Sequence, residues 1–170
     1  PEVVPELKKL TDAIHAEGAK ASIQLGHCGN MTHRSTCHCT PIGAINGFNL
    51  YSPTFYRKMT RDDIEFVAKS FGEATKLCIE AGFDAVEVHA GHGYLISQFL
   101  SPYTNRRKDE FGGSLENRMR FMRMCISEVV KAGKGKIALT AKLNTRDGFK
   151  GGQETEELIE VAKELQRLGI

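Results

Sequence analysis

Hydrophobic residues recur at helical spacing in four segments of the chain. These segments cover residues 5–17, 60–81, 114–132 and 155–168, and a glycine follows each of them, as is common at helix ends. Thr60 with Asp63 matches a capping box, and Ser114 is a favoured N-cap residue. Each helix is expected to turn one apolar stripe inward. The residues of these stripes are Leu7, Leu10, Ile14, Ile64, Val67, Ala68, Phe71, Ala74, Leu77, Leu115, Met119, Met122, Ile126, Val129, Leu158, Val161, Ala162 and Leu165.

Three shorter segments between these helices are predicted to be strands. They cover residues 20–25, 84–89 and 137–144, so helices and strands alternate. This alternation indicates parallel βαβ units, in an open doubly wound sheet or in a (β/α)₈ barrel. No G-x-G-x-x-G follows a strand, which counts against a Rossmann dinucleotide site. The chain begins with a helix that expects a preceding strand and stops where another should begin, so we expect a fragment of a longer sequence.

Each predicted strand has one apolar face and one face of small or polar residues. Side chains alternate between the faces of a strand, so Val86 and Val88 share one face while His89 lies on the other. The most polar residues of the second faces are Gln24, His89 and Lys142, and each lies near the carboxyl end of its strand. Barrel enzymes place their active sites at this end. These three side chains are therefore candidate site residues.

The composition fits a single globular domain and argues against several function classes. Hydrophobic residues make up 41% and charged residues 26% of the 170 positions, with a net charge of +2. No strong field therefore points to nucleic acid or a membrane surface as a partner. No apolar run reaches the length of a membrane span. The five cysteines are an odd number and do not suggest a disulfide framework, so a cytoplasmic location is expected.

A cluster of cysteines and histidines follows the first predicted strand. Its spacing does not match the cysteine pairs of common zinc sites. We therefore expect no bound metal, and a metal-binding module remains an alternative of a different class. The members of the cluster are His27, Cys28, His33, Cys37, His38 and Cys39.

The segment that follows the second predicted strand carries the densest chemistry. It supplies the imidazoles of His89 and His92 and the phenol of Tyr94 within six residues. A His-x-x-His pair is compatible with zinc, but the segment offers no clear third ligand. Two hydrogen-bond donors aimed at one carbonyl oxygen would instead stabilise the charge of an enolate. A nearby phenol could then act as a general acid.

Several stretches of the sequence resemble the old yellow enzyme family of FMN oxidoreductases. The resemblance covers essentially the whole chain, although Asn30 stands where the family usually has arginine. It implies an α/β fold, namely a partial (β/α)₈ TIM barrel of roughly the third to fifth βα units, with residues 1–170 as one domain. The matching stretches are Gln24-Leu-Gly-His27, His89-x-x-His92-Gly-Tyr94-Leu, Gln98-Phe-Leu-Ser-Pro102, Gly112-Gly-Ser-Leu-Glu-Asn-Arg118-Met-Arg-Phe121 and Lys142-Leu-Asn144.

The resemblance also implies roles for individual residues. Gln24 would hydrogen-bond the flavin pyrimidine ring, and Lys142 would lie near flavin N1 and the C2 carbonyl, where a cation favours the reduced flavin. His89 and His92 would bind the carbonyl oxygen of an electron-poor alkene, and Tyr94 would protonate its α-carbon. Four further matching residues are interpreted as structural, namely Asn105, Arg106, Arg118 and Arg120.

The implied function is the reduction of activated C=C bonds in small enone or enoate substrates, with FMN as cofactor and NADH or NADPH as reductant. The enoate-reductase branch often carries an iron–sulfur cluster, which would lie outside residues 1–170. Family members acting on amines, or on steroid or acyl-CoA enones, are the alternative within enzymes. An inactive remnant is a further alternative. The isolated chain is expected to be inactive because three strands cannot close an eight-stranded barrel.

Overall fold

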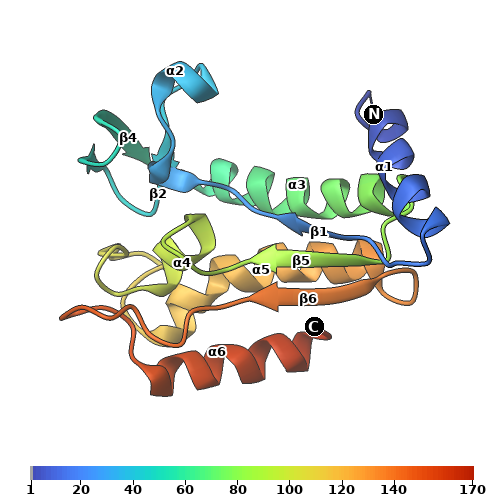
Figure 1. The fold of residues 1–170 in the computed structure, drawn as a ribbon. Helices are drawn as coiled ribbons and strands as arrows, with labels where there is room; N and C mark the ends of the chain where they lie inside the picture. Colours follow the sequence, from blue (N-terminus) through green and yellow to red (C-terminus); the bar gives the residue numbers. More distant parts are fainter. Residues whose placement is uncertain (1) are drawn as a thin grey trace.

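A computed structural model describes residues 2–170 and contains a main sheet of three parallel strands. The strands lie in the order β1 (Ser22–Leu25), β5 (Ala85–His89), β6 (Ala138–Lys142). Four longer helices accompany the sheet, and α3 and α5 pack side by side against one of its faces (Figure 1). These helices are α1 (Val4–Ala16), α3 (Arg61–Glu80), α5 (Leu115–Gly133) and α6 (Thr155–Leu168). The sequence prediction of parallel βαβ units is confirmed.

A second, smaller sheet lies toward the carboxyl ends of the main strands (Figure 1). Its central strand β4 (Thr54–Lys58) pairs in parallel with β2 (Ile42–Gly43) and antiparallel with β3 (Gly47–Asn49). Three short helical segments lie at the same end of the molecule, where Figure 1 labels two of them, α2 and α4. They are η1 (Gly29–Met31), α2 (Arg34–Cys37) and α4 (Leu95–Leu100). The hydrophobic pattern predicted none of these short elements.

The ends of the long helices follow the capping residues of the sequence. The Thr60 side chain accepts a hydrogen bond from the Asp63 backbone N–H, and the Asp63 carboxylate accepts one from the Thr60 N–H, which completes the capping box of α3. Ser114 caps α5 by accepting from the Asn117 N–H. Gly169 ends α6 with a left-handed φ of 106°. All four predicted helices are confirmed to within about two residues.

The main core lies between the apolar face of the sheet and α3, α5 and α6. The predicted inward stripes are largely buried, but Leu10 is 52% exposed and Ala162 is also exposed, so these two assignments were wrong. Thr11 and Glu164 are buried in their place. The Thr11 hydroxyl donates to the Ala81 carbonyl oxygen at 2.6 Å, and the Glu164 carboxylate binds two arginines. Because these polar groups have partners, they can be buried at low cost.

The opposite face of the main sheet is open. The strand residues that point to this face include Gln24, Thr140 and Lys142, which are exposed. β1 and β6 are edge strands, each with β5 as its neighbour in the sheet. A parallel sheet backed by helices on one face is the arrangement of a barrel segment, whose open face corresponds to the barrel interior. Among residues 2–170, no helix combines the length and apolar character needed to cross a membrane.

Candidate active site

The five predicted site residues all lie at the carboxyl ends of the main strands. His89 and Lys142 are the last residues of β5 and β6 and are register partners across the two strands. Gln24 lies on the same face of the sheet in β1, where its register partner is Glu87. Glu87 precedes His89 by two residues, so Gln24 lies roughly 7 Å before His89 along the strand direction. His92 and Tyr94 follow β5 in the turn that precedes α4. The structure therefore brings together residues that are up to 118 positions apart in the sequence.

The two histidines and the tyrosine form a cluster of rings centred on His89. The ring centroids of His89 and His92 are 5.0 Å apart, and those of His89 and Tyr94 are 4.9 Å apart. Both pairs meet edge to face, with interplanar angles of 74°. His89 is 7% exposed, Tyr94 is half-buried and His92 is exposed. The cluster thus offers two imidazoles and a phenol at one position beside the open face.

The surroundings of His89 favour a neutral ring that donates through Nε2. Burial lowers the pKa of His89 below its usual 6.5, and the charges of His92 and Lys142 act in the same direction, while the Glu87 carboxylate opposes them. Nδ1 of His89 faces the Gly91 backbone N–H at 3.4 Å. An acceptor at Nδ1 leaves the ring proton on Nε2. His89 can therefore donate a hydrogen bond to a carbonyl oxygen at neutral pH.

The turn that carries His92 and Tyr94 has an unusual backbone. His92 has a φ of 59° and Gly93 a φ of 75°, so two successive residues are left-handed, the first of them not a glycine. The His92 backbone N–H donates to Oδ1 of Asn144 at 2.9 Å. Buried Gln98 donates to the Gly93 carbonyl oxygen at 2.7 Å. Asn144 and Gln98 hold this turn, although the sequence analysis gave neither of them a role.

Gln24 and Lys142 supply complementary polar groups on the open face. Nε2 of Gln24 donates to Oε1 of Glu87 at 2.5 Å, which leaves the Gln24 carbonyl oxygen as a free acceptor. Within residues 2–170, the Lys142 ammonium forms no hydrogen bond or ion pair, so its charge is available to a ligand. An acceptor and a cation on one face fit a flavin pyrimidine ring, which has an N–H donor and gains negative charge on reduction. Glu87 is a further site residue that the sequence analysis missed.

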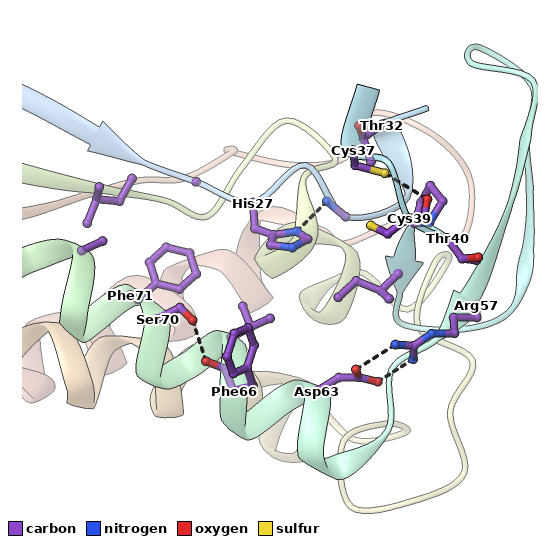
Figure 2. Close-up of a pocket in the computed structure, with 17 residues that line it drawn as sticks. His27, Thr32, Cys37, Cys39, Thr40, Arg57, Asp63, Phe66, Ser70 and Phe71 are labelled. Carbon is purple, nitrogen blue, oxygen red and sulfur yellow. Dashed lines mark hydrogen bonds and ion pairs between the residues drawn. The ribbon is translucent and has the colours of Figure 1, made fainter. Parts of the chain in front are cut away.

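A cavity of about 650 Å³ lies beside α3, near the carboxyl end of β1 (Figure 2). It is lined by the end of β1, by one face of α3 and by the segment around α2. None of the five predicted site residues lines it. His27 points toward this cavity, and burial lowers its pKa. The cavity is therefore not formed by the five predicted site residues, although Gly26 in its lining lies next to His89.

The cysteines and histidines after β1 do not form a ready-made metal site. All five cysteines are free thiols. In the part of the chain that the structure describes, no three or more histidine, cysteine, aspartate or glutamate side chains gather closely enough to hold a metal ion. The metal-binding module thus has no assembled ligand set.

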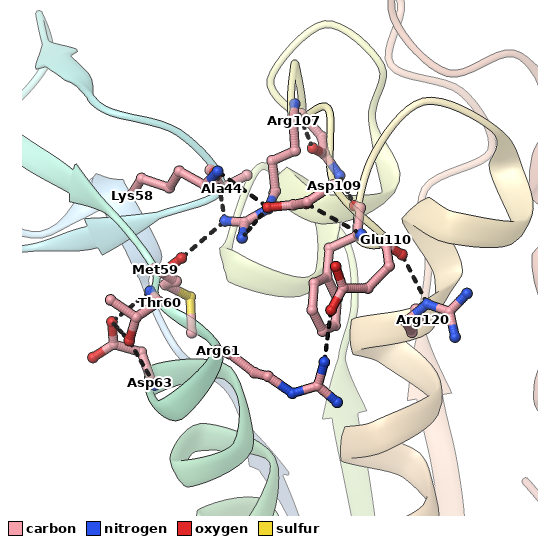
Figure 3. Close-up of polar contacts among 12 residues, drawn as sticks. Ala44, Lys58, Met59, Thr60, Arg61, Asp63, Arg107, Asp109, Glu110 and Arg120 are labelled. Atoms are coloured by element: carbon pink, nitrogen blue, oxygen red, sulfur yellow. Dashed lines mark hydrogen bonds and ion pairs between the residues drawn. The ribbon is translucent and has the colours of Figure 1, made fainter.

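Arg107 ties the loop after α4 to the small sheet (Figure 3). Its guanidinium donates to the carbonyl oxygens of Ala44 and Met59, each at 3.0 Å, and pairs with both carboxylate oxygens of Asp109 at 2.9 and 2.8 Å. The Arg107 side chain is only 3% exposed. Lys58 adds a second cation 3.1 Å from Asp109. This network holds two loops at the carboxyl end of the sheet in a fixed arrangement.

The four residues that were interpreted as structural all bind backbone carbonyl groups. Asn105 donates to the carbonyl oxygens of Phe99 and Phe111, both at 2.7 Å. Buried Arg118 donates to carbonyl oxygens at the end of α4 and just before α5, and it forms an ion pair with α6. Arg106 and Arg120 also donate to nearby carbonyl oxygens. These contacts agree with the structural interpretation.

The fold is that of a segment of a (β/α)₈ barrel, with the candidate site residues at the carboxyl ends of its strands. The chain belongs to the NADH:flavin oxidoreductase / NADH oxidase family, whose model matches residues 1–170. The sequence resemblance to flavin oxidoreductases is thereby confirmed.

Curated relatives match nearly the whole chain but only part of their own length. A 4,4'-dithiodibutanoate disulfide reductase of Rhodococcus erythropolis is 34% identical over 98% of this chain and 41% of its own. An NADPH dehydrogenase of Halalkalibacterium halodurans is 38% identical over 96% of this chain and 47% of its own. The chain therefore spans less than half the length of these two relatives.

Solved structures share the fold closely. A 2-naphthoyl-CoA reductase in complex with 2-naphthoyl-CoA superposes with a TM-score of 0.91 at 35% identity, over 97% of this chain and 27% of that one. An old yellow enzyme homologue from Zymomonas mobilis gives a TM-score of 0.87 at 28% identity, over 98% of this chain and 50% of that one. The fold assignment to part of an old yellow enzyme barrel is confirmed.

Proposed function

We propose that the protein containing this chain is an FMN-dependent reductase of activated C=C bonds, with NADH or NADPH as the reductant. The substrate class is the α,β-unsaturated carbonyl or enoate compound. The observation that carries the proposal is the cluster of His89, His92 and Tyr94 beside the free Lys142 ammonium. A neutral imidazole donor, a second imidazole and a phenol are the groups that bind and protonate an enolate.

Each residue of the site has a distinct task in this reaction. Gln24 and Lys142 would hold the flavin pyrimidine ring through the free amide oxygen and the ammonium charge. Bound FMN would supply hydride received from NAD(P)H. His89 would donate its Nε2–H to the substrate carbonyl oxygen, together with His92, and both would stabilise the negative charge that develops there. Tyr94 would deliver a proton to the α-carbon.

The position of these residues also explains why the turn after β5 is held so firmly. Two donors stabilise one oxygen well only when their directions are fixed before the substrate arrives. Asn144 and Gln98 fix the backbone at His92 and Gly93, and the ring of Tyr94 packs against His89. In this proposal, the left-handed backbone of His92 sets the direction of its ring beside His89.

The alternatives differ in substrate and in the direction of electron flow. The similarity to a 2-naphthoyl-CoA reductase favours acyl-CoA thioesters as a second candidate substrate class, because the same histidines can bind a thioester carbonyl oxygen. Amine oxidation, by contrast, would transfer electrons from the substrate to the flavin. It needs no hydrogen-bond donor to a substrate carbonyl oxygen. A small-molecule partner and a cytoplasmic location belong to the proposal, and the five free thiols agree with the location.

The test uses the full-length protein loaded with FMN under anaerobic conditions. NADPH or NADH should bleach the visible flavin absorption, and an α,β-unsaturated ketone should then restore it, whereas the saturated ketone should not. An enoyl thioester assayed in parallel distinguishes the two carbonyl substrate classes. Bleaching by an amine without NAD(P)H, together with no response to either carbonyl substrate, would overturn the proposal.

A further inference from the structure

Two cysteines lie two residues apart at the end of the short helix α2. Cys37 is the last residue of α2, and Cys39 follows after His38, which is one of two left-handed residues other than glycine in residues 2–170. His38 has φ 53° and ψ 22°. When a residue has right- or left-handed helical φ and ψ, the Cα atoms of the residues before and after it lie about 5.5 Å apart. This separation lies in the range that a disulfide spans.

The two thiols also face the same space. Cys37 and Cys39 both line the cavity beside α3, and Figure 2 shows their side chains next to each other. Sγ of Cys37 lies 3.2 Å from the carbonyl oxygen of Cys39, so the side chain of the first cysteine folds back onto the second. Cys39 is exposed and Cys37 is half-buried. A small molecule in the cavity can therefore reach both sulfur atoms.

The neighbours of the pair distinguish the two thiols. Hydrogen bonding with the Cys39 backbone lowers the pKa of the Cys37 thiol, whereas hydrogen bonding with Cys37 raises the pKa of the Cys39 thiol. These directions and the exposure of Cys39 assign Cys37 as the attacking thiol and Cys39 as the resolving thiol. By contrast, Cys28 is an exposed cysteine on the other side of η1 and is not among the residues that line the cavity.

We propose that Cys37 and Cys39 form a dithiol site for thiol–disulfide exchange with small organic disulfides. The Cys37 thiolate attacks one sulfur of the disulfide RSSR, so that a Cys37–SR bond forms, the S–S bond of RSSR breaks and one RS⁻ leaves. The Cys39 thiolate then attacks Sγ of Cys37, which forms the Cys37–Cys39 bond and releases the second RS⁻. The two protons lost by the cysteines go to the two RS⁻ groups.

The net step oxidises the protein dithiol by two electrons and reduces one RSSR to two RSH. Excess thiol reverses it. The chemistry needs neither the flavin nor the residues of the ring cluster, so its outcome is independent of the proposed reductase function.

The test uses the reduced full-length protein, 2-hydroxyethyl disulfide as the probe at about 0.1 mM, alkylation of remaining thiols and tryptic mass mapping. Trypsin gives one peptide, 35–57, that contains Cys37 and Cys39 and no other cysteine, and another, 21–34, that contains only Cys28. A second thiol on a short linker acts at an effective concentration of millimolar or more. The amount of peptide 35–57 with the Cys37–Cys39 disulfide should therefore exceed the amount with mixed disulfides by about tenfold or more.

Two variants separate the roles of the cysteines. Cys39→Ser should trap a stable mixed disulfide on Cys37, and Cys37→Ser should form one on Cys39 more slowly. The peptide with Cys28 is the internal reference and should carry only a mixed disulfide. The proposal is overturned if peptide 35–57 keeps its mixed disulfides without closing, or if its cysteines stay reduced while Cys28 reacts.

Discussion

Removing the charge of Lys142 should make the flavin harder to reduce. Lys142 is the exposed last residue of β6, and its ammonium forms no ion pair within residues 2–170, so no carboxylate neutralises its field. A unit charge about 4 Å from a second charge contributes about 1 kcal/mol in water and about 4 kcal/mol at an effective dielectric constant of 20. For a two-electron couple, about 1.4 kcal/mol corresponds to 30 mV. Lys142→Met should therefore lower the flavin midpoint potential by about 20–90 mV.

The assay is an anaerobic redox titration of the full-length flavoprotein against a reference dye. Lys136→Met is the matched control, because Lys136 is also exposed and lies six residues earlier, near the amino end of β6. That distance is about 20 Å along a strand, well beyond the screening length of about 8 Å. The control should keep the wild-type potential. If Lys142→Met also leaves the potential unchanged while still binding FMN, Lys142 does not lie beside the flavin.

Two further predictions follow from the contacts of single residues. Arg107→Ala should lower the free energy of unfolding by about 2–5 kcal/mol in urea titrations, because it leaves the buried Ala44 and Met59 carbonyl groups without a donor. Asp109 would keep Lys58 as its remaining cation. The exposed Arg106→Ala should cost less than about 1 kcal/mol, and equal losses would refute this account of Arg107. His89 should titrate below 6.5 in NMR spectra. Because its pKa is lower in the folded state, its contribution to stability is present above pH 6.5 and is lost as the pH falls below that value. A midpoint at or above 6.5 would contradict the assignment of a buried neutral ring.

The sequence predicted those parts of the fold in which apolar residues recur at a regular spacing. The long helices show apolar residues at helical spacing, and the three main strands alternate between an apolar and a polar face. α4 escaped prediction because all six of its residues, 95–100, are buried, so it has no polar face to reveal a period. The strands of the small sheet have two to five residues, too few for a pattern to emerge.

The residues of the candidate site also fall into those that a local sequence pattern predicts and those that it does not. Gln24, His89 and Lys142 were predictable because each lies near the carboxyl end of a strand, on its polar face. Glu87 and Asn144 were not, because their roles depend on the register between segments far apart in the chain. Glu87 meets a partner 63 residues away, and Asn144 meets one 52 residues away. A single sequence does not encode such pairings in any local pattern.

The measurement that tests the central claim most directly is the kinetics of Tyr94→Phe in the full-length protein. The substitution removes only the hydroxyl, so the ring contact with His89 at 4.9 Å should survive. Flavin reduction by NAD(P)H requires no proton from Tyr94 and should stay near the wild-type rate. Reoxidation by an α,β-unsaturated ketone should slow by about 10²–10⁴-fold, the usual contribution of a positioned acid. Stopped-flow traces in which both half-reactions slow equally, or neither slows, would contradict the assignment of Tyr94 as the proton donor.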